Sequence, residues 1–251
     1  MKLTPLNLLV LSLAVAPGPA SAGEGEPSRL IVFTEDAAPH SVSKDGQVVG
    51  ASTEFVRMMV EKAGFKPDVR MMSWKAVLQV AETQPAALIY PISRTSEREA
   101  SYAWIGRLAN YKTYLYKLKA RTDIALKKTD DAKAYKIAAI REDVREEFLL
   151  AHGFRQQGIV GVTDNKEAMR LLMIGRVDLA PLSQVGLEGT CVAEKMNCSL
   201  FEQELPLGLT MDVYVAANKN TPADTVRRLQ NAYDGLVADG SYQRLLGKFQ
   251  Q

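Results

Sequence analysis

Ala86-Ala87-Leu88-Ile89-Tyr90 is a short apolar run that predicts a buried strand. The run leads into Ser93-Arg94-Thr95-Ser96-Glu97-Arg98, where a helical pattern begins. Thr95 or Ser96 is suited to cap that helix, and Glu99 has the capping-box spacing from Ser96. The free backbone N–H groups at such a helix start favour an anion, so we interpret this segment as an anion-binding loop.

Arg98 falls in the first turn of the expected helix. Its guanidinium is a planar, two-pronged donor that matches a carboxylate, which favours a site for the acidic end of a small solute. The alternative is an ordinary ion pair between Arg98 and Glu97 or Glu99.

Strand and helix patterns alternate along the rest of the chain. The predicted strands are residues 29–34, 69–72, 86–90, 137–140, 159–162, 177–181 and 211–217. The predicted helices begin at Ser52, Trp74, Asp143, Asp164 and Thr221. The order β-α-β-α-β occurs once before about Ala120 and then restarts. This order predicts an α/β fold of two lobes, each an open α/β sheet, with a cleft between them.

The loop after the first predicted strand is rich in turn-forming and acidic residues. It reads Glu35-Asp36-Ala37-Ala38-Pro39-His40. Ligands of open α/β sheets bind at the carboxyl ends of the strands, so Glu35 and Asp36 are candidate ligand-binding residues. Asp45-Gly46, a little further on, predicts the turn of a β-hairpin.

Composition excludes several classes of function. The chain has 251 residues, of which 47% are hydrophobic, and a formal net charge of +2. These values fit a folded protein and give no sign of a nucleic-acid partner or of a membrane surface. Lys2, the apolar run 6–16 and Ala20-Ser21-Ala22 have the pattern of a signal peptide. We therefore expect cleavage after Ala22 and a soluble, periplasmic protein.

The two cysteines of the chain are Cys191 and Cys198. One close pair in an exported chain predicts a disulfide. A metal site is the weaker alternative, because His40 and His152, the only histidines, are far away in sequence. We expect no metal and no cofactor.

Three short motifs give the chain a family resemblance. Asp45-Gly46-Gln47-Val48-Val49-Gly50 has the form Asp-Gly-x-h-x-Gly, where h is apolar, and Ser93, Thr95 and Arg98 form Ser-x-Thr-x-x-Arg. Gly175-Arg176-Val177-Asp178 has the form Gly-[Arg/Lys]-h-Asp. Their order and spacing resemble the extracellular (periplasmic) solute-binding proteins of family 3, the polar amino-acid receptors of ABC transporters, over essentially the whole mature chain.

The resemblance implies a two-lobed periplasmic-binding-protein fold of type II. Lobe 1 would comprise residues 28–117 and 214–251 and lobe 2 residues 118–213, with two hinge strands between them. It also implies that Arg98, helped by Ser93, binds the carboxylate of an acidic solute. The cleft would close on the solute, and a monomeric receptor would present it to an ABC permease in the inner membrane.

The chain departs from the family pattern at several site positions. The Asp that binds the α-ammonium of an amino acid is replaced by Ser183, and the Gly-Thr/Ser step of the second lobe is replaced by Arg141-Glu142-Asp143. Arg141 is then a second anion donor or a surface partner of Glu142, and Asp143 is a ligand residue or only a helix cap. Trp74 is a candidate wall of the cleft or a core residue. These departures indicate a divergent member.

The leading hypothesis is a non-enzymatic binding protein that serves transport. One alternative is an enzyme on the same fold, similar to a cyclic-acid dehydratase. Its general acid would be one of four acidic residues: Glu35, Asp36, Glu54 and Asp143. The other alternative is an exported sensor or partner-binding protein that has lost amino-acid binding.

Overall fold

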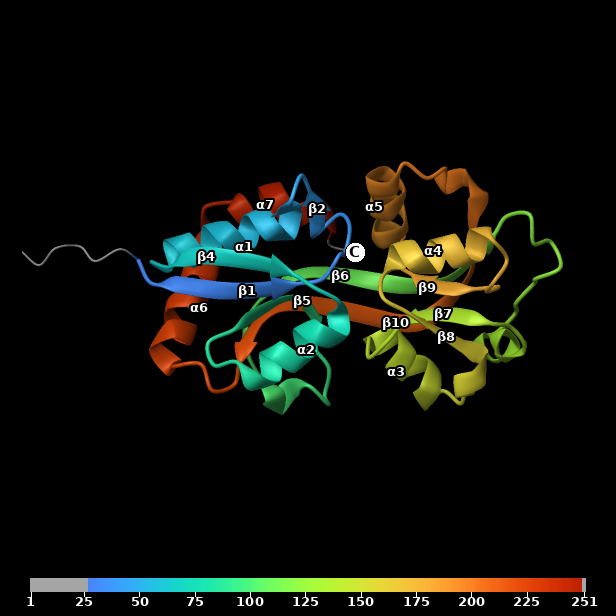
Figure 1. Cartoon of the computed structure of the whole chain (residues 1–251), viewed down its shortest axis with the longest axis horizontal. Helices are drawn as coiled ribbons and strands as arrows, with labels where there is room; N and C mark the ends of the chain where they lie inside the picture. Colours follow the sequence, from blue (N-terminus) through green and yellow to red (C-terminus); the bar gives the residue numbers. More distant parts are fainter. Residues whose placement is uncertain (1–26, 250–251) are drawn as a thin grey trace, which may run out of the picture.

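Two long antiparallel strands connect the two halves of the molecule. The computed structural model describes residues 27–249, so the expected signal peptide (1–22) lies outside the described residues. Strands β6 (Tyr102–Leu118) and β10 (Phe201–Asn218) pair along most of their length and run through both halves (Figure 1). Their register shifts between Pro206 and Thr210, and Gly208 in this interval has a positive φ of 81°.

A six-stranded mixed sheet has the strand order β4-β1-β5-β10-β6-β9. In the first half, β1 (Arg29–Thr34) pairs in parallel with β4 (Lys66–Met71) and β5 (Leu88–Ser93). β5 then pairs in antiparallel fashion with β10. The parallel strands bring the loops after β1 and β5 to the same edge of the sheet, which faces the second half.

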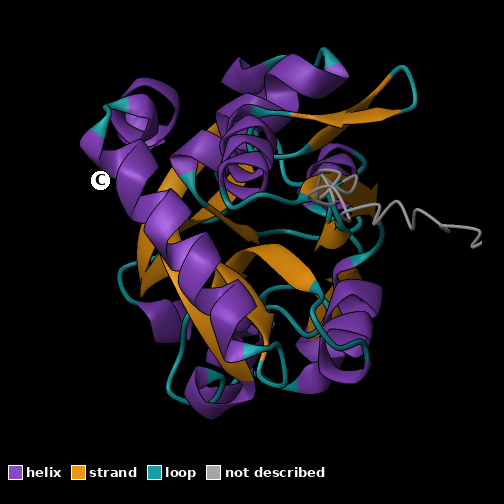
Figure 2. Ribbon diagram, turned by 90° about the vertical axis from the view of Figure 1, so that its left-hand side faces the viewer, coloured by secondary structure: helices purple, strands orange, loops and turns teal. Residues whose placement is uncertain are grey.

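Both faces of this sheet are covered by helices (Figures 1 and 2). Helices α1 (Ala51–Lys62), α6 (Ala223–Ala238) and α7 (Ser241–Leu246) pack on one face, against Leu88 and Tyr90. Helix α2 (Trp74–Thr83) packs on the other face, against Ile89. Alternate residues of β5 therefore serve opposite cores, as strand geometry requires.

The second half repeats the strand-helix order around a smaller set of strands. β7 (Ile137–Ile140) pairs in parallel with β8 (Ile159–Val162), and β9 (Ala180–Leu182) pairs with β6. An isolated β-bridge between Ile137 of β7 and Leu179, the residue before β9, connects the β7–β8 pair to the β9–β6 pair. The helices are α3 (Val144–Ala151), α4 (Asn165–Met173) and α5 (Gln184–Glu194).

The remaining elements are short. The hairpin predicted at Asp45-Gly46 is confirmed: β2 (Val42–Lys44) pairs with β3 (Gln47–Val49), and both turn residues have positive φ. The 3-10 helices are η1 (Glu99–Ser101), η2 (Thr129–Ala134), η3 (Gln156–Gly158), η4 (Cys198–Leu200) and η5 (Gly247–Phe249).

The predicted disulfide is confirmed. Cys191 on α5 is bonded to Cys198 on η4, with a Cα–Cα distance of 5.7 Å. In the part of the chain that the structure describes, no helix is long and apolar enough to cross a membrane.

Three predicted helix caps are wrong, among them Thr221, because the N-cap of α6 is Pro222 and the helix begins at Ala223. The helix expected after Ser93–Arg98 is only the single turn η1, because β6 already begins at Tyr102 and Arg94 binds Glu99 instead of leaving it to a capping box. Ser52 does not cap α1, since the N-cap is Gly50. By contrast, Asp143 caps α3 and Asp164 caps α4, as predicted.

Candidate functional site

A small cavity of about 70 Å³ lies between the two halves. The first half contributes Glu35 from the loop after β1 and Ser93 from the end of β5. The second half contributes Asp143, Arg145 and Ser183, all at helix starts. Its further lining residues include Ala37, Ala38, His40, Pro91, Tyr111, Asn165, Gly186, Met211 and Val213. The cavity is therefore mostly polar on the side of the second half.

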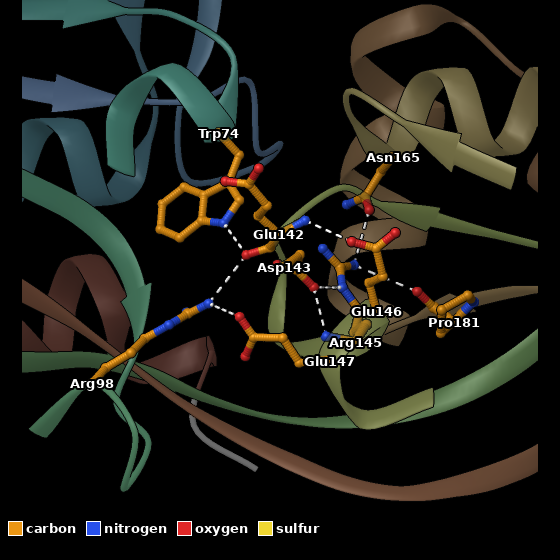
Figure 3. A network of polar contacts seen from close by, with 9 residues as sticks. All are labelled: Trp74, Arg98, Glu142, Asp143, Arg145, Glu146, Glu147, Asn165 and Pro181. Carbon is orange, nitrogen blue, oxygen red and sulfur yellow. Dashed lines mark hydrogen bonds and ion pairs between the residues drawn. The ribbon is translucent and has the colours of Figure 1, made fainter. Parts of the chain in front are cut away.

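Arg145 and Asp143 form a buried ion pair in the cavity wall (Figure 3). Nε of Arg145 donates to Oδ1 of Asp143 at 2.6 Å, and Nη1 donates to Oδ1 of Asn165 at 3.0 Å. Burial raises the pKa of Asp143, but the guanidinium outweighs burial and holds that pKa below its ordinary value. The pair is thus charged, and the charge of Arg145 is compensated by the protein itself.

Glu35 lies on the opposite wall and is only 7% exposed. Its Oε2 has no hydrogen-bond partner among residues 27–249. Burial, followed by the nearby charge of Asp143, raises the pKa of this carboxyl to about 8. Glu35 therefore carries a proton at neutral pH, because an unpaired buried carboxylate is costly.

His40 and Tyr111 form an uncharged part of the wall. Nδ1 of His40 lies 2.8 Å from Oγ of Ser52, and Nε2 is bonded to the hydroxyl of Tyr111. Burial, followed by the charge of Lys248, lowers the pKa of His40 to about 4. The imidazole is consequently neutral at physiological pH.

Arg98 lies next to this cavity and bridges the two halves (Figure 3). Its side chain is 11% exposed, and Nη2 donates to Oε1 of Glu147 at 2.7 Å and to the carbonyl oxygen of Glu142 at 3.1 Å. The guanidinium also lies 5.8 Å from the ring centre of Trp74. The two-pronged donor expected for a solute carboxylate is thus bonded to acceptors of the second half.

Glu142 is the common acceptor of this cluster. It has a positive φ of 61°, and its carbonyl oxygen also accepts a hydrogen bond from Nε1 of Trp74 at 3.0 Å. Its carboxylate accepts a hydrogen bond from Nζ of Lys75 at 2.6 Å. A left-handed conformation at a non-glycine residue is strained and persists only when its surroundings hold it. Here Trp74, Lys75 and Arg98 of the first half hold Glu142 in this conformation through their hydrogen bonds to it.

Direct contacts also close the other side of the cavity. Asp36, in the first half, lies 3.6 Å from Nζ of Lys166 on α4. Gly189 on α5 packs against the loop after β1 so closely that a Cβ there would lie 2.5 Å from Cδ of Pro39. The cavity is therefore bounded on both sides by contacts between the halves.

The residues singled out from the sequence fall into two groups. Glu35, Ser93, Asp143 and Ser183 line the cavity. The other four do not line it. Arg98 and Trp74 donate hydrogen bonds to Glu142, and Asp36 forms an ion pair with Lys166. Arg141 is exposed, and its side chain packs against Gly161.

Asp143 and Ser183 both act as helix caps in addition to lining the cavity. Oδ1 of Asp143 accepts from the N–H of Arg145 at 2.9 Å, and Oγ of Ser183 accepts from the N–H of Gly186 at 3.0 Å. The Ser183 hydroxyl can still donate to a solute, since a hydroxyl both accepts and donates.

Sequence reasoning missed four of the polar side chains that line the cavity: Arg145, Asn165, His40 and Tyr111. The only local signal was the short spacing between Asp143 and Arg145, which places a base beside a helix cap. Among residues 27–249, no group of three or more His, Cys, Asp or Glu side chains is arranged to hold a metal ion.

The chain is similar in sequence to one family of known proteins. Residues 30–251 match the family model of bacterial extracellular solute-binding proteins, family 3. No curated protein matches the chain by sequence.

Solved structures share the fold. A histidine kinase sensor domain with similarity to periplasmic binding proteins is 17% identical, with 89% of this chain and 96% of that chain covered and a TM-score of 0.78. A mutant of ArgBP from T. maritima is 16% identical, with 88% and 95% covered and a TM-score of 0.77. An amino acid ABC transporter substrate-binding protein from Streptococcus pneumoniae, bound to L-arginine, is 25% identical, with 88% and 93% covered and a TM-score of 0.73. These neighbours are consistent with the two-lobed α/β fold expected from the sequence.

Proposed function

Because the chain belongs to the bacterial extracellular solute-binding proteins of family 3, we propose that it captures a small solute in the cavity between its two halves. One observation carries the proposal: polar groups of both halves meet in this cavity. Glu35 and Ser93 face Asp143, Arg145 and Ser183 there. A site shared by two halves is completed only when they come together, which couples solute binding to closure.

Closure in this proposal takes place about β6 and β10. These strands are the long connections between the halves, and their pairing is interrupted between Pro206 and Thr210. The moving lobes are residues 28–117 with 214–251, and residues 118–213. A break in strand pairing supports hinge motion there, because fewer backbone hydrogen bonds resist bending.

The acidic end of the solute is proposed to bind Arg98. In the structure Nη2 of Arg98 forms an ion pair with the carboxylate of Glu147, whose side chain is 47% exposed. A solute carboxylate that displaces Glu147 would make the same charge-assisted hydrogen bonds. Ser93 lines the neighbouring cavity and can bond the same solute.

The biological role proposed is non-enzymatic delivery of the solute to an ABC permease by a monomeric, periplasmic receptor. The family to which the chain belongs supports this role, as does the streptococcal neighbour, which is an ABC transporter substrate-binding protein. The role requires reversible capture without chemical change of the solute.

A second candidate is a sensor module. Arg98 is already bonded by Glu147 and Glu142, so the halves are held together by groups of the chain itself. Such a protein can report a change in closure to a partner without transporting anything. The similarity in fold to a histidine kinase sensor domain supports the sensor module as this second candidate.

Thermal-shift assays with amino acids, organic acids and cyclic acids test the proposal. A solute present at about 100 times its dissociation constant adds about 2.7 kcal/mol to the free energy of unfolding and raises the melting temperature. Arg98→Ala should abolish the shift without loss of the fold. The matched control is Arg94→Ala, because Arg94 forms an exposed pair with Glu99 in the same half. If no compound shifts the melting temperature, solute capture is wrong and the sensor candidate takes its place.

A further inference from the structure

A second and larger groove lies along helix α3. It has a volume of about 560 Å³, and its walls come from the loop after β5 in the first half and from α3 in the second half, with Leu209 of β10 between them in sequence contact with neither. This volume falls within the range of about 300–1,000 Å³ that small-molecule pockets occupy, whereas the polar cavity has only about 70 Å³. The groove can therefore hold a solute body for which the polar cavity is too small.

Arg98 belongs to the wall of this groove and not to that of the polar cavity. Its Nη2 is bonded to Glu147 and to the carbonyl oxygen of Glu142 (Figure 3). Among residues 27–249, none accepts a hydrogen bond from its Nε or Nη1. A guanidinium has five N–H donors, so Arg98 keeps donors for a carboxylate that enters the groove. A solute held by Arg98 accordingly has its body in the groove.

Apolar side chains line the groove beyond Arg98. Val144, Phe148 and Ala151 are four and three residues apart and so share one face of α3, and Leu209 joins them from β10. The ring of Phe148 stacks on the imidazole of His152, with the ring centres 3.8 Å apart. An aromatic ring or a branched alkyl group placed against these side chains would be removed from water, which favours its binding.

The charged groups of the groove favour an acid as the occupant. Glu147 is already paired with Arg98, and Glu97 is exposed and accepts a hydrogen bond from the hydroxyl of Ser96. The side chain of Arg98 is only 11% exposed, whereas that of Glu147 is 47% exposed. Ion pairs with solvent-exposed groups contribute little to binding, so the shielded guanidinium rather than the two acids selects the charge of the solute.

We propose that this groove binds the apolar body of the solute, and that the solute is a carboxylic acid with an aromatic or branched alkyl group. The inference rests on the proposed function, in which Arg98 binds the solute carboxylate, and narrows it to apolar acids. The body lies along α3 against Phe148 and Leu209. Leu209 falls between Pro206 and Thr210, where the pairing of β6 and β10 shifts, so the body contacts the proposed hinge as well as the second half.

Titration calorimetry with matched compounds tests the proposal. The apolar acids are 3-phenylpropionate and 4-methylpentanoate, and acetate is a carboxylate without an apolar body. In 3-phenylpropanamide and 3-phenylpropylamine the same phenyl group is present without the negative charge. Because the groove buries the apolar body, at least one apolar acid should bind about tenfold or more tightly than acetate. The amide and the amine should bind about tenfold or more weakly than 3-phenylpropionate, because they lose the charge-assisted hydrogen bonds to Arg98.

Three variants of α3 locate the binding of the body. Phe148→Ala removes the ring from the groove and should weaken the binding of the apolar acid about tenfold. Ala151→Glu places a carboxylate at an exposed position of the groove, so it should leave the fold intact and weaken binding about threefold or more. Leu150→Ala is the matched control, because Leu150 is 40% exposed on the same helix and does not line the groove. It should leave the affinity unchanged.

The outcomes separate this inference from solute capture itself. Equal binding of acetate and the apolar acids, binding of the amide or the amine as tight as that of 3-phenylpropionate, or unchanged affinity in both Phe148→Ala and Ala151→Glu would each overturn the inference. Solute capture would stand in those cases, as it would if only compounds of the thermal-shift panel bound. Binding of no compound from either panel would overturn both.

Discussion

Nη2 of Arg98 lies 2.7 Å from Oε1 of Glu147, across the boundary between the two halves. The contact satisfies the guanidinium with a carboxylate of the chain itself. If Arg98 binds the solute carboxylate as proposed, Glu147 competes with that carboxylate, and the strength of the Arg98–Glu147 ion pair sets part of the cost of solute binding.

Removing that competitor should strengthen the binding of acidic solutes. Glu147→Gln leaves Arg98 with a weaker, neutral acceptor, and we expect affinity to rise about threefold to tenfold, or about 1 kcal/mol. Titration calorimetry measures the change. Glu97→Gln is the matched control, because Glu97 is an exposed acid near Arg98 that is bonded to Ser96. Equal affinities of Glu147→Gln and the wild type would show that Glu147 is no competitor.

Breaking the buried Arg145–Asp143 pair should strongly destabilise the fold. Arg145→Met leaves Asp143 as an uncompensated buried charge, and we expect a loss of about 3–5 kcal/mol in the free energy of unfolding. Arg227→Met breaks an exposed pair with Asp224 and should cost less than about 1 kcal/mol. Urea denaturation of both variants compares the losses. A cost below about 1 kcal/mol for Arg145→Met would contradict the burial of this pair.

Glu35 should make stability fall as pH rises. Its pKa is raised from 4.5 to about 8, so between these values the folded state keeps a proton that the unfolded state loses. The free energy of unfolding then decreases by at most about 1.4 kcal/mol per pH unit and levels off above pH 8. Glu35→Gln should lack this decrease and gain stability over the wild type from pH 5 to pH 8. Parallel pH profiles of the two proteins would argue against a protonated Glu35.

Gly189 should be required for the close approach of the halves. A Cβ at this position would lie 2.5 Å from Cδ of Pro39 and 2.8 Å from the carbonyl carbon of Ala38, so Gly189→Ala should hold the halves apart. Small-angle X-ray scattering should then show a larger radius of gyration than in the wild type. Gly235→Ala is the control, because its added Cβ meets only the flexible side chain of Lys62. An unchanged radius for Gly189→Ala would mean that the contact does not limit closure.

Local patterns predicted much of the fold. The hairpin at Asp45-Gly46 and the caps Asp143 and Asp164 depend on neighbouring residues, so the sequence was sufficient to find them. The capping box of Ser96 and Glu99 has equally good spacing, yet it does not form. Arg94 binds Glu99, and the next strand starts too soon for a helix.

The candidate site was only partly predictable. Glu35 and Ser93 follow strands whose carboxyl ends meet at one edge of the sheet, a rule that can be applied to a sequence. The partners of Arg98 cannot be found in this way, because Glu142 and Glu147 are 44 and 49 residues further along the chain. The burial of Arg145 likewise depends on how the two halves meet.

Hydrogen exchange measured by mass spectrometry tests most directly whether solute binds between the halves. The protein would be compared with and without a saturating amount of the compound that stabilises it most in the thermal-shift assays. Binding between the halves should slow exchange on both walls of the cavity, at residues 35–41 and at residues 142–146, and also at the start of α5 at Gln184. Slower exchange in one half alone, or at neither wall, would contradict it.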